Sequence, residues 1–210
     1  MTTRLCIVRH GETDWNVEKR IQGHTDIPLN ETGHAQALAM AFNAAHHRFA
    51  AIYSSDLARA METAAYIAAR EEHVVRPSPK LRERHYGIFQ GITAQEALGL
   101  YPQAHARYIA RDPDYDFESG EDMHAFAARV MDGFREIVRH HEGQTVLAVS
   151  HSGALDILYR KATGRPLHTP RDFKIPNCGL NWFVVDAHGW HLEHWADRHH
   201  LGQVLMEPPE

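Results

Sequence analysis

The segment Arg9-His10-Gly11-Glu12-Thr13 combines residue types that can transfer a phosphoryl group. A neutral imidazole such as that of His10 is a nucleophile toward phosphorus, and the adjacent Arg9 guanidinium can bind two phosphate oxygens at once. Gly11 lets the backbone approach a bound anion closely. An isolated Arg-His-Gly triplet is also common at the solvated end of an ordinary strand, so this interpretation depends on the residues that accompany it.

Three other segments carry groups that suit the same chemistry. Arg59 falls in the first turn of an expected helix, where free N–H groups already favour an anion. Glu83 is a carboxyl group that can protonate a leaving alkoxide, because a nearby phosphate dianion favours the protonated form. His151 follows an apolar run, and a protonated imidazole there would stabilise charge on a transferring phosphoryl group. Taken singly, Arg59 also fits a solvated helix arginine, and Glu83 fits a surface ion pair.

The elements that must position these groups are short strands alternating with helices. Apolar runs predict strands at 5–8, 51–55, 145–149 and 180–185. Helical patterns cover 33–47, 56–64, 94–111, 121–141 and 154–163. The alternation predicts an α/β sandwich with a mainly parallel sheet. Such sheets bind ligands at the carboxyl ends of their strands, so Arg9-His10, Arg59 and His151 are expected at one sheet edge.

Size and composition exclude several classes of protein. The chain has 210 residues with 43% hydrophobic and 23% charged residues, which fits a single globular domain over 1–210. Its formal net charge of −5 argues against a general nucleic-acid binder. No apolar run approaches the roughly 20 residues of a membrane span, and no signal peptide is apparent, so we expect no membrane association and a cytoplasmic location.

Cysteine and histidine content also bears on the kind of site. The 2 cysteines are too few for a disulfide scaffold. The 18 histidines include adjacent pairs, whose members do not share a helix face, and none of the spacings matches a recognised zinc motif. We therefore expect surface histidines and no metal site.

Taken together and in order, the motifs resemble those of the histidine phosphatase superfamily, in its phosphoglycerate mutase-like branch. The motifs that carry the resemblance are Val8–Asn16, Gln22-Gly23, Leu29–Gly33, Ser54–Ala60, Arg82–Gly87 and Val149–His151. They cover most of the chain, from about Leu5 to near Asn177. The resemblance implies a three-layer α/β/α sandwich, which agrees with the alternation of elements.

The resemblance also implies roles for individual residues. His10 corresponds to the phosphorylated nucleophile, Glu83 to the acid that later acts as base, and Arg9, Arg59 and His151 to the rest of the catalytic phosphate pocket. The implied substrate-binding residues are Arg9, His10, Asn16, Gln22, Gly23, Arg59, Glu83, Tyr86, His151 and Ser152. No cofactor and no metal are expected. The expected partner is a small phosphorylated metabolite, and a homodimer is left open.

Three functions are compatible with these residues. The favoured one is a phosphatase that hydrolyses a small phosphomonoester through a phosphohistidine. A phosphoglycerate mutase, an isomerase that depends on 2,3-bisphosphoglycerate, is the alternative, because Arg82–Gly87 is close to the mutase motif. Against it, Gly91–Ala94 lacks the mutase lysine, and Arg107 and Arg111 do not form the adjacent arginine pair, although they could share a helix face. A non-catalytic binding module is disfavoured, because each position that corresponds to a catalytic residue of the family carries a residue able to do that chemistry.

Overall fold

A six-stranded sheet forms the middle layer of the computed structural model, which describes residues 1–44 and 46–202. The strands are β1 (Thr3–Arg9), β2 (Ala51–Ser54), β3 (Val75–Pro77), β4 (Thr145–Ser150), β5 (Leu180–Asp186) and β6 (Gly189–Asp197). Their order is β3-β2-β4-β1-β5-β6. The pairs among β3, β2, β4 and β1 are parallel, whereas β5 and β6 join antiparallel. The sheet is therefore mainly parallel, as predicted.

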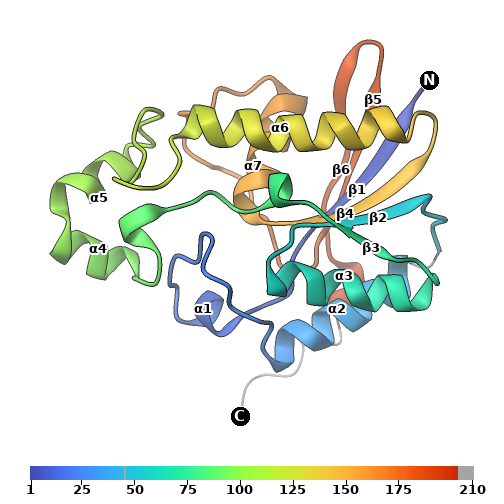
Figure 1. The fold of residues 1–210 in the computed structure, drawn as a ribbon, viewed down its shortest axis with the longest axis horizontal. Coiled ribbons are helices and arrows are strands. Elements are labelled where there is room, and N and C mark those ends of the chain that lie inside the picture. Colours follow the sequence, from blue (N-terminus) through green and yellow to red (C-terminus); the bar gives the residue numbers. More distant parts are fainter. Residues whose placement is uncertain (45, 203–210) are drawn as a thin grey trace.

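Helices cover both faces of this sheet (Figure 1). They are α1 (Asp14–Val17), α2 (Glu31–Ala44), α3 (Ala58–Arg70), α4 (Ala94–Leu100), α5 (Pro102–Ile109), α6 (Met123–His140) and α7 (Ser152–Thr163). In Figure 1, α2 and α3 lie on one side of the sheet and α6 and α7 on the other, while α4 and α5 stand apart at one end. This arrangement confirms the predicted three-layer sandwich. None of the helices in the described ranges has both the length and the apolar composition to cross a lipid bilayer.

Two hydrophobic cores explain the continuous apolar run of β1. Leu5 and Ile7 pack into the core on the side of α6 and α7, whereas Cys6 and Val8 pack into the core on the side of α2 and α3. All four side chains are fully buried. A strand covered on both faces needs apolar residues at every position, which is why its pattern is continuous rather than alternating.

Three parts of the fold differ from the sequence expectations. The helix expected over 94–111 is two helices, because Pro102 cannot continue α4 and instead begins α5. Arg111 lies beyond α5 with φ of 53°, so it does not share a helix face with Arg107. The edge strands β3 and β6 were not predicted: β3 has only 3 residues, and every residue of β6 is partly or fully exposed.

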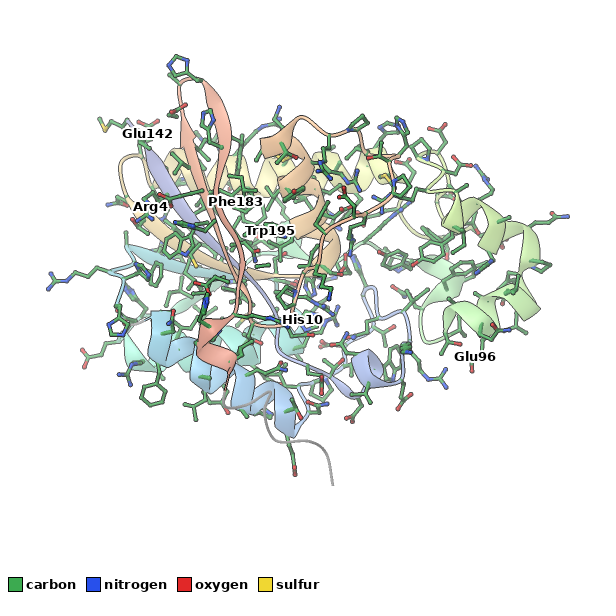
Figure 2. The ribbon with its side chains drawn as sticks, turned by 180° about the vertical axis from the view of Figure 1, so that it is seen from behind. Arg4, His10, Glu96, Glu142, Phe183 and Trp195 are labelled. Carbon is green, nitrogen blue, oxygen red and sulfur yellow. The ribbon has the colours of Figure 1, made fainter. Side chains whose placement is uncertain are left out.

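The carboxyl ends of the parallel strands meet at one edge of the sheet. Arg9 at the end of β1 pairs in register with Ser150 at the end of β4. His10 and His151 are the next residues of their chains, and the His10 N–H donates to the Ser150 carbonyl over 3.0 Å. Figure 2 labels His10 at this edge. The sheet therefore brings together two histidines that are 141 positions apart in the sequence.

Candidate active site

His10 is held in one tautomer. Its ring is buried, and Nδ1 lies 2.7 Å from the Gly11 carbonyl oxygen. A carbonyl can only accept, so Nδ1 carries the proton and Nε2 carries the lone pair. Burial, together with the Arg59 and Arg9 guanidiniums, lowers the pKa of His10 well below its usual range. His10 is therefore a neutral imidazole with a free electron pair at neutral pH, which is the form that attacks phosphorus.

His151 lies directly beside His10. The two ring centroids are 5.1 Å apart and the planes are tilted by 57°. The His151 ring is fully buried, and neither of its nitrogens has a hydrogen-bond partner among residues 1–44 and 46–202. Burial, followed by the Arg59 charge, lowers the pKa of His151 well below its usual range. In the free protein His151 is thus neutral, with one N–H to donate.

Two arginines supply the positive charge of the site. Arg59, in the first turn of α3, donates from Nη1 and Nη2 to the carbonyls of Thr25 (2.9 Å) and Gly23 (2.8 Å). Arg9 donates from Nη1 to the carbonyl of Ile175 (2.8 Å). These contacts fix both guanidiniums without neutralising either. Burial lowers the pKa of Arg9 and of Arg59 to about 10, so both remain cations at neutral pH.

Several buried nitrogens of the site have no partner. In the part of the chain that the structure describes, Arg9 Nε, Arg59 Nε and both ring nitrogens of His151 make no hydrogen bond. A buried donor without an acceptor costs about 1–3 kcal/mol, so such groups are rare unless a ligand satisfies them. Phosphate oxygens are strong acceptors that also balance the arginine charges. The donor set and its charge therefore fit a phosphate dianion.

Glu83 is fixed by the start of α7. Its Oε1 accepts from the backbone N–H of Arg84 (2.8 Å), and its Oε2 accepts from the N–H of Gly153 (3.0 Å) and the hydroxyl of Ser152 (3.1 Å). The side chain is nearly buried. Ser152, predicted as a substrate contact, thus orients the Glu83 carboxyl as well as lining the pocket. These hydrogen bonds fix the Glu83 carboxyl group in the same cavity that His10 lines.

These residues surround a cavity of about 160 Å³. Its walls contain most of the residues predicted from the sequence: Arg9, His10, Asn16, Gln22, Gly23, Arg59, Glu83, Tyr86 and Ser152. His151 reaches the site through its contact with the His10 ring. The sequence did not single out Arg20, Ile21 and Tyr108, which also line the cavity. Arg20 and Ile21 adjoin the Gln22-Gly23 motif, which was the available signal, whereas Tyr108 on α5 gives no signal in the sequence.

Side chains that could hold a metal ion do not gather near this cavity or elsewhere in the described ranges. No group of three or more His, Cys, Asp and Glu side chains with suitable placement occurs there.

Comparison with known proteins identifies the family. The sequence model of the histidine phosphatase superfamily (branch 1) matches residues 5–198. The chain belongs to this superfamily. A phosphoglycerate mutase-like protein 4 from Arabidopsis thaliana is 37% identical, over 95% of this chain and 87% of the relative. A metal-independent phosphoserine phosphatase from Arabidopsis thaliana is 35% identical, over 96% of this chain and 84% of the relative.

Solved structures of similar sequence share the fold. YhfR from Bacillus stearothermophilus superposes with a TM-score of 0.87 at 32% identity, over 95% of this chain and 99% of that protein. The superfamily predicted from the ordered motifs is confirmed, and so is the three-layer fold. The phosphatase among the relatives bears out the prediction of an enzyme with phosphatase chemistry.

Proposed function

We propose that this protein hydrolyses a small phosphomonoester through a covalent phosphohistidine on His10, without a metal ion or organic cofactor. The observation that carries the proposal is that one buried nitrogen with a free electron pair lies beside several hydrogen-bond donors that have no acceptor. His10 Nε2 has the electron pair, because Nδ1 is bound to the Gly11 carbonyl. Arg9, Arg59 and His151 hold buried nitrogens without partners among the described residues.

In the first step, His10 Nε2 attacks phosphorus while the bond from phosphorus to the alcohol oxygen breaks. Glu83 gives its proton to the departing oxygen, so the product is a neutral alcohol. Arg9, Arg59 and the N–H of His151 donate to the other phosphoryl oxygens, where charge must be stabilised. The Gly11 carbonyl stabilises the positive charge that develops on His10, because it accepts from Nδ1–H.

In the second step, water attacks the phosphohistidine. Glu83, now a carboxylate, takes a proton from this water, as microscopic reversibility requires. The bond between phosphorus and Nε2 breaks, and His10 returns to its neutral form as inorganic phosphate leaves. The contacts of Glu83 with Ser152 and Gly153 keep the carboxyl in one place for both proton transfers.

A mutase is the second candidate. It is favoured by the mutase-like relative from Arabidopsis thaliana and by the Arg82–Gly87 stretch. A mutase would pass the phosphoryl group from His10 to 3-phosphoglycerate rather than to water, and it would need 2,3-bisphosphoglycerate to start. Arg107 on α5 does not supply the carboxylate clamp of a mutase, because its Nε donates to Asp112 over 2.7 Å and half of its side chain is exposed.

Trapping the intermediate tests the proposal. Protein mixed with a phosphorus-labelled phosphomonoester and quenched in alkali should carry acid-labile label on His10. His10→Asn should lose the label, while the control His124→Asn, at an exposed position on α6, should keep it. Turnover without any label on wild-type protein under rapid quench would contradict the proposal.

A second assay separates the two candidates. With 3-phosphoglycerate, a phosphatase releases inorganic phosphate with or without 2,3-bisphosphoglycerate. A mutase instead forms 2-phosphoglycerate, and only when the bisphosphate is present. Three predictions remain to be tested. A panel of phosphomonoesters tests for a small phosphorylated metabolite as substrate, sedimentation tests for the homodimer, and cell fractionation tests the cytoplasmic location.

A further inference from the structure

One arginine outside the phosphate pocket binds the backbone of the segment that carries Glu83. Arg129, on α6, donates from Nη1 to the carbonyls of Lys80 (3.0 Å) and Arg82 (3.1 Å). Its Nη2 donates to the carbonyl of Glu83 itself, over 2.9 Å. A guanidinium has five N–H donors in a fixed plane, so one side chain can hold several carbonyls in a defined arrangement. Arg129 therefore holds the backbone that leads to Glu83.

Glu121 fixes the direction of this guanidinium. Its Oε1 accepts from Arg129 Nε and its Oε2 from Arg129 Nη2, both over 2.7 Å. Glu121 Oε2 also accepts from the backbone N–H of His85 (3.0 Å), two residues after Glu83. The Arg129 and Glu121 side chains are only 21% and 20% exposed. A two-pronged pair of this kind has a better defined geometry than an exposed ion pair. The pair thus ties α6 to the chain on both sides of Glu83.

A glycine on α6 lets the helix come close enough for these contacts. Gly133 is buried and lies four residues after Arg129, on the same face of the helix. A Cβ added at Gly133 would lie 2.8 Å from Lys80 Cβ, closer than Cβ atoms pack in proteins. The absence of a side chain at Gly133 therefore allows α6 to pack directly against the segment that precedes Glu83.

The Glu83 carbonyl accepts from a second side chain. His24 Nε2 lies 2.8 Å from this oxygen, which can only accept, so Nε2 carries the proton. The carbonyls on either side of His24 in the chain are the two that Arg59 binds. The backbone of Glu83 is therefore linked to α6 through Arg129 and to an arginine of the phosphate pocket through His24.

We propose that Arg129 is a positioning residue for Glu83, acting through the backbone and not through the substrate. The inference rests on the proposed phosphatase function. Ser152 and Gly153 hold the carboxyl end of the side chain. They keep it within reach of the leaving oxygen only while the backbone of Glu83 stays in place. Proton transfer needs hydrogen-bond distance, and a displacement of about 1 Å can cost on the order of 100-fold in rate.

The leaving group separates a positioning role from a general effect on the fold. Arg129→Gln should slow the single-turnover cleavage of an alkyl phosphate, which needs a proton from Glu83, by about 10- to 100-fold. The loss stays below that of removing the Glu83 carboxyl, because His24 still binds the carbonyl. Release of p-nitrophenolate, which needs no proton, should stay close to the wild-type rate. The affinity for inorganic phosphate, measured by calorimetry, should be unchanged.

Further variants keep the test decisive if urea unfolding shows that Arg129→Gln does not fold. Arg129→Lys keeps the charge but lacks the planar fork, so its alkyl cleavage should fall between wild type and Arg129→Gln. Gly133→Ala, which pushes α6 away from the bound segment, should slow alkyl cleavage selectively as well. Arg135→Gln, exposed on the same helix, and Gly99→Ala, where a Cβ meets nothing within 4 Å, are the controls and should behave as wild type.

Failure of the inference and failure of the proposed function give different results. Suppose that Arg129→Gln or, where it does not fold, Gly133→Ala slows alkyl and aryl cleavage equally, or slows neither. Arg129 is then not a positioning residue, while the phosphatase function stands. If the wild-type protein forms no phosphohistidine and hydrolyses neither kind of ester, the proposed function is wrong, and the positioning role is overturned with it.

Discussion

The rings of His10 and His151 lie 5.1 Å apart, and both are flanked by the charges of Arg9 and Arg59. Protonating either ring would place a third cation among buried groups, where charge repulsion and desolvation both act against it. The pKa of each histidine is accordingly lowered well below its usual range, mainly by burial. The free site therefore combines two neutral imidazoles with two permanent cations.

The stability of the protein should fall as the pH falls below that of unfolded histidine. Unfolded histidine binds a proton near pH 6.5, whereas His10 and His151 remain neutral in the folded protein to well below that pH. The unfolded state then binds more protons, so each histidine lowers the free energy of unfolding by up to about 1.4 kcal/mol per pH unit. Urea unfolding at several pH values between about 7.5 and 5 measures this slope.

A variant isolates the contribution of one ring. His151→Asn should have a pH slope smaller than wild type by up to about 1.4 kcal/mol per unit, because Asn does not titrate. His124→Asn, at an exposed position, should keep the wild-type slope. Identical slopes for wild type and His151→Asn would show that His151 is protonated in the folded protein.

Chelators should leave the activity intact. Arg9 and Arg59 keep their charge at neutral pH, since their pKa values are about 10. In the proposed mechanism these charges and an N–H of His151 take the place of the Mg²⁺ that many phosphoryl-transfer enzymes use. Rates with excess EDTA should match those without it. A loss of activity that a divalent ion restores would mean that a metal takes part.

Much of this site could be predicted from the sequence because the ends of buried strands can be recognised in it. A strand buried on both faces leaves a continuous apolar run, and β1 and β4 both show one. His10 and His151 are the first residues after these two strands, so the parallel pairing of β1 and β4 was enough to place them together. Arg59 could be placed for a similar reason, since it lies in the first turn of α3, the helix after β2.

Other features depend on long-range packing that leaves no local pattern. Tyr108 lines the phosphate pocket from α5, although it lies far from His10 in the sequence. Arg171, in the segment between α7 and β5, lines an adjoining cavity together with Tyr86 and Tyr108. Ser152 was predicted to touch the substrate from the family resemblance. Its hydroxyl binds Glu83, which lies 69 positions away in the sequence. The sequence alone does not show whether the Ser152 hydroxyl contacts the substrate or a distant side chain such as Glu83.

Gly153 should be essential for the position of Glu83. A Cβ added at Gly153 would lie 2.0 Å from Glu83 Oε1 and 3.1 Å from Phe126 Cζ, so alanine there must displace the carboxyl. We expect Gly153→Ala to slow hydrolysis of alkyl phosphates by about 10²- to 10⁴-fold, the usual worth of general acid–base help. Gly99→Ala on α4 is the control, since a Cβ there meets nothing within 4 Å. Full activity in Gly153→Ala would show that Glu83 tolerates displacement.

Replacing Glu83 should affect substrates according to their leaving groups. An alkyl alkoxide leaves phosphorus poorly and needs a proton during bond cleavage. In the proposed mechanism His10 cannot supply that proton, because its free Nε2 attacks phosphorus and its Nδ1–H is bound to Gly11. The arginines hold their protons at neutral pH. Glu83→Gln should therefore slow the cleavage of alkyl phosphates by about 10²- to 10⁴-fold in single-turnover experiments.

An aryl phosphate provides the internal control for Glu83→Gln. p-Nitrophenolate departs without a proton, so its release from the variant should be nearly as fast as from wild type. Dephosphorylation still needs a base to take the proton of water, which glutamine cannot do. The variant should thus give a burst of p-nitrophenol followed by slow steady turnover. Equal losses for alkyl and aryl phosphates in the cleavage step would mean that Glu83 is structural. The proton donor would then have to be another side chain of the pocket, with Tyr86 and Tyr108, which line it, as the next groups to replace.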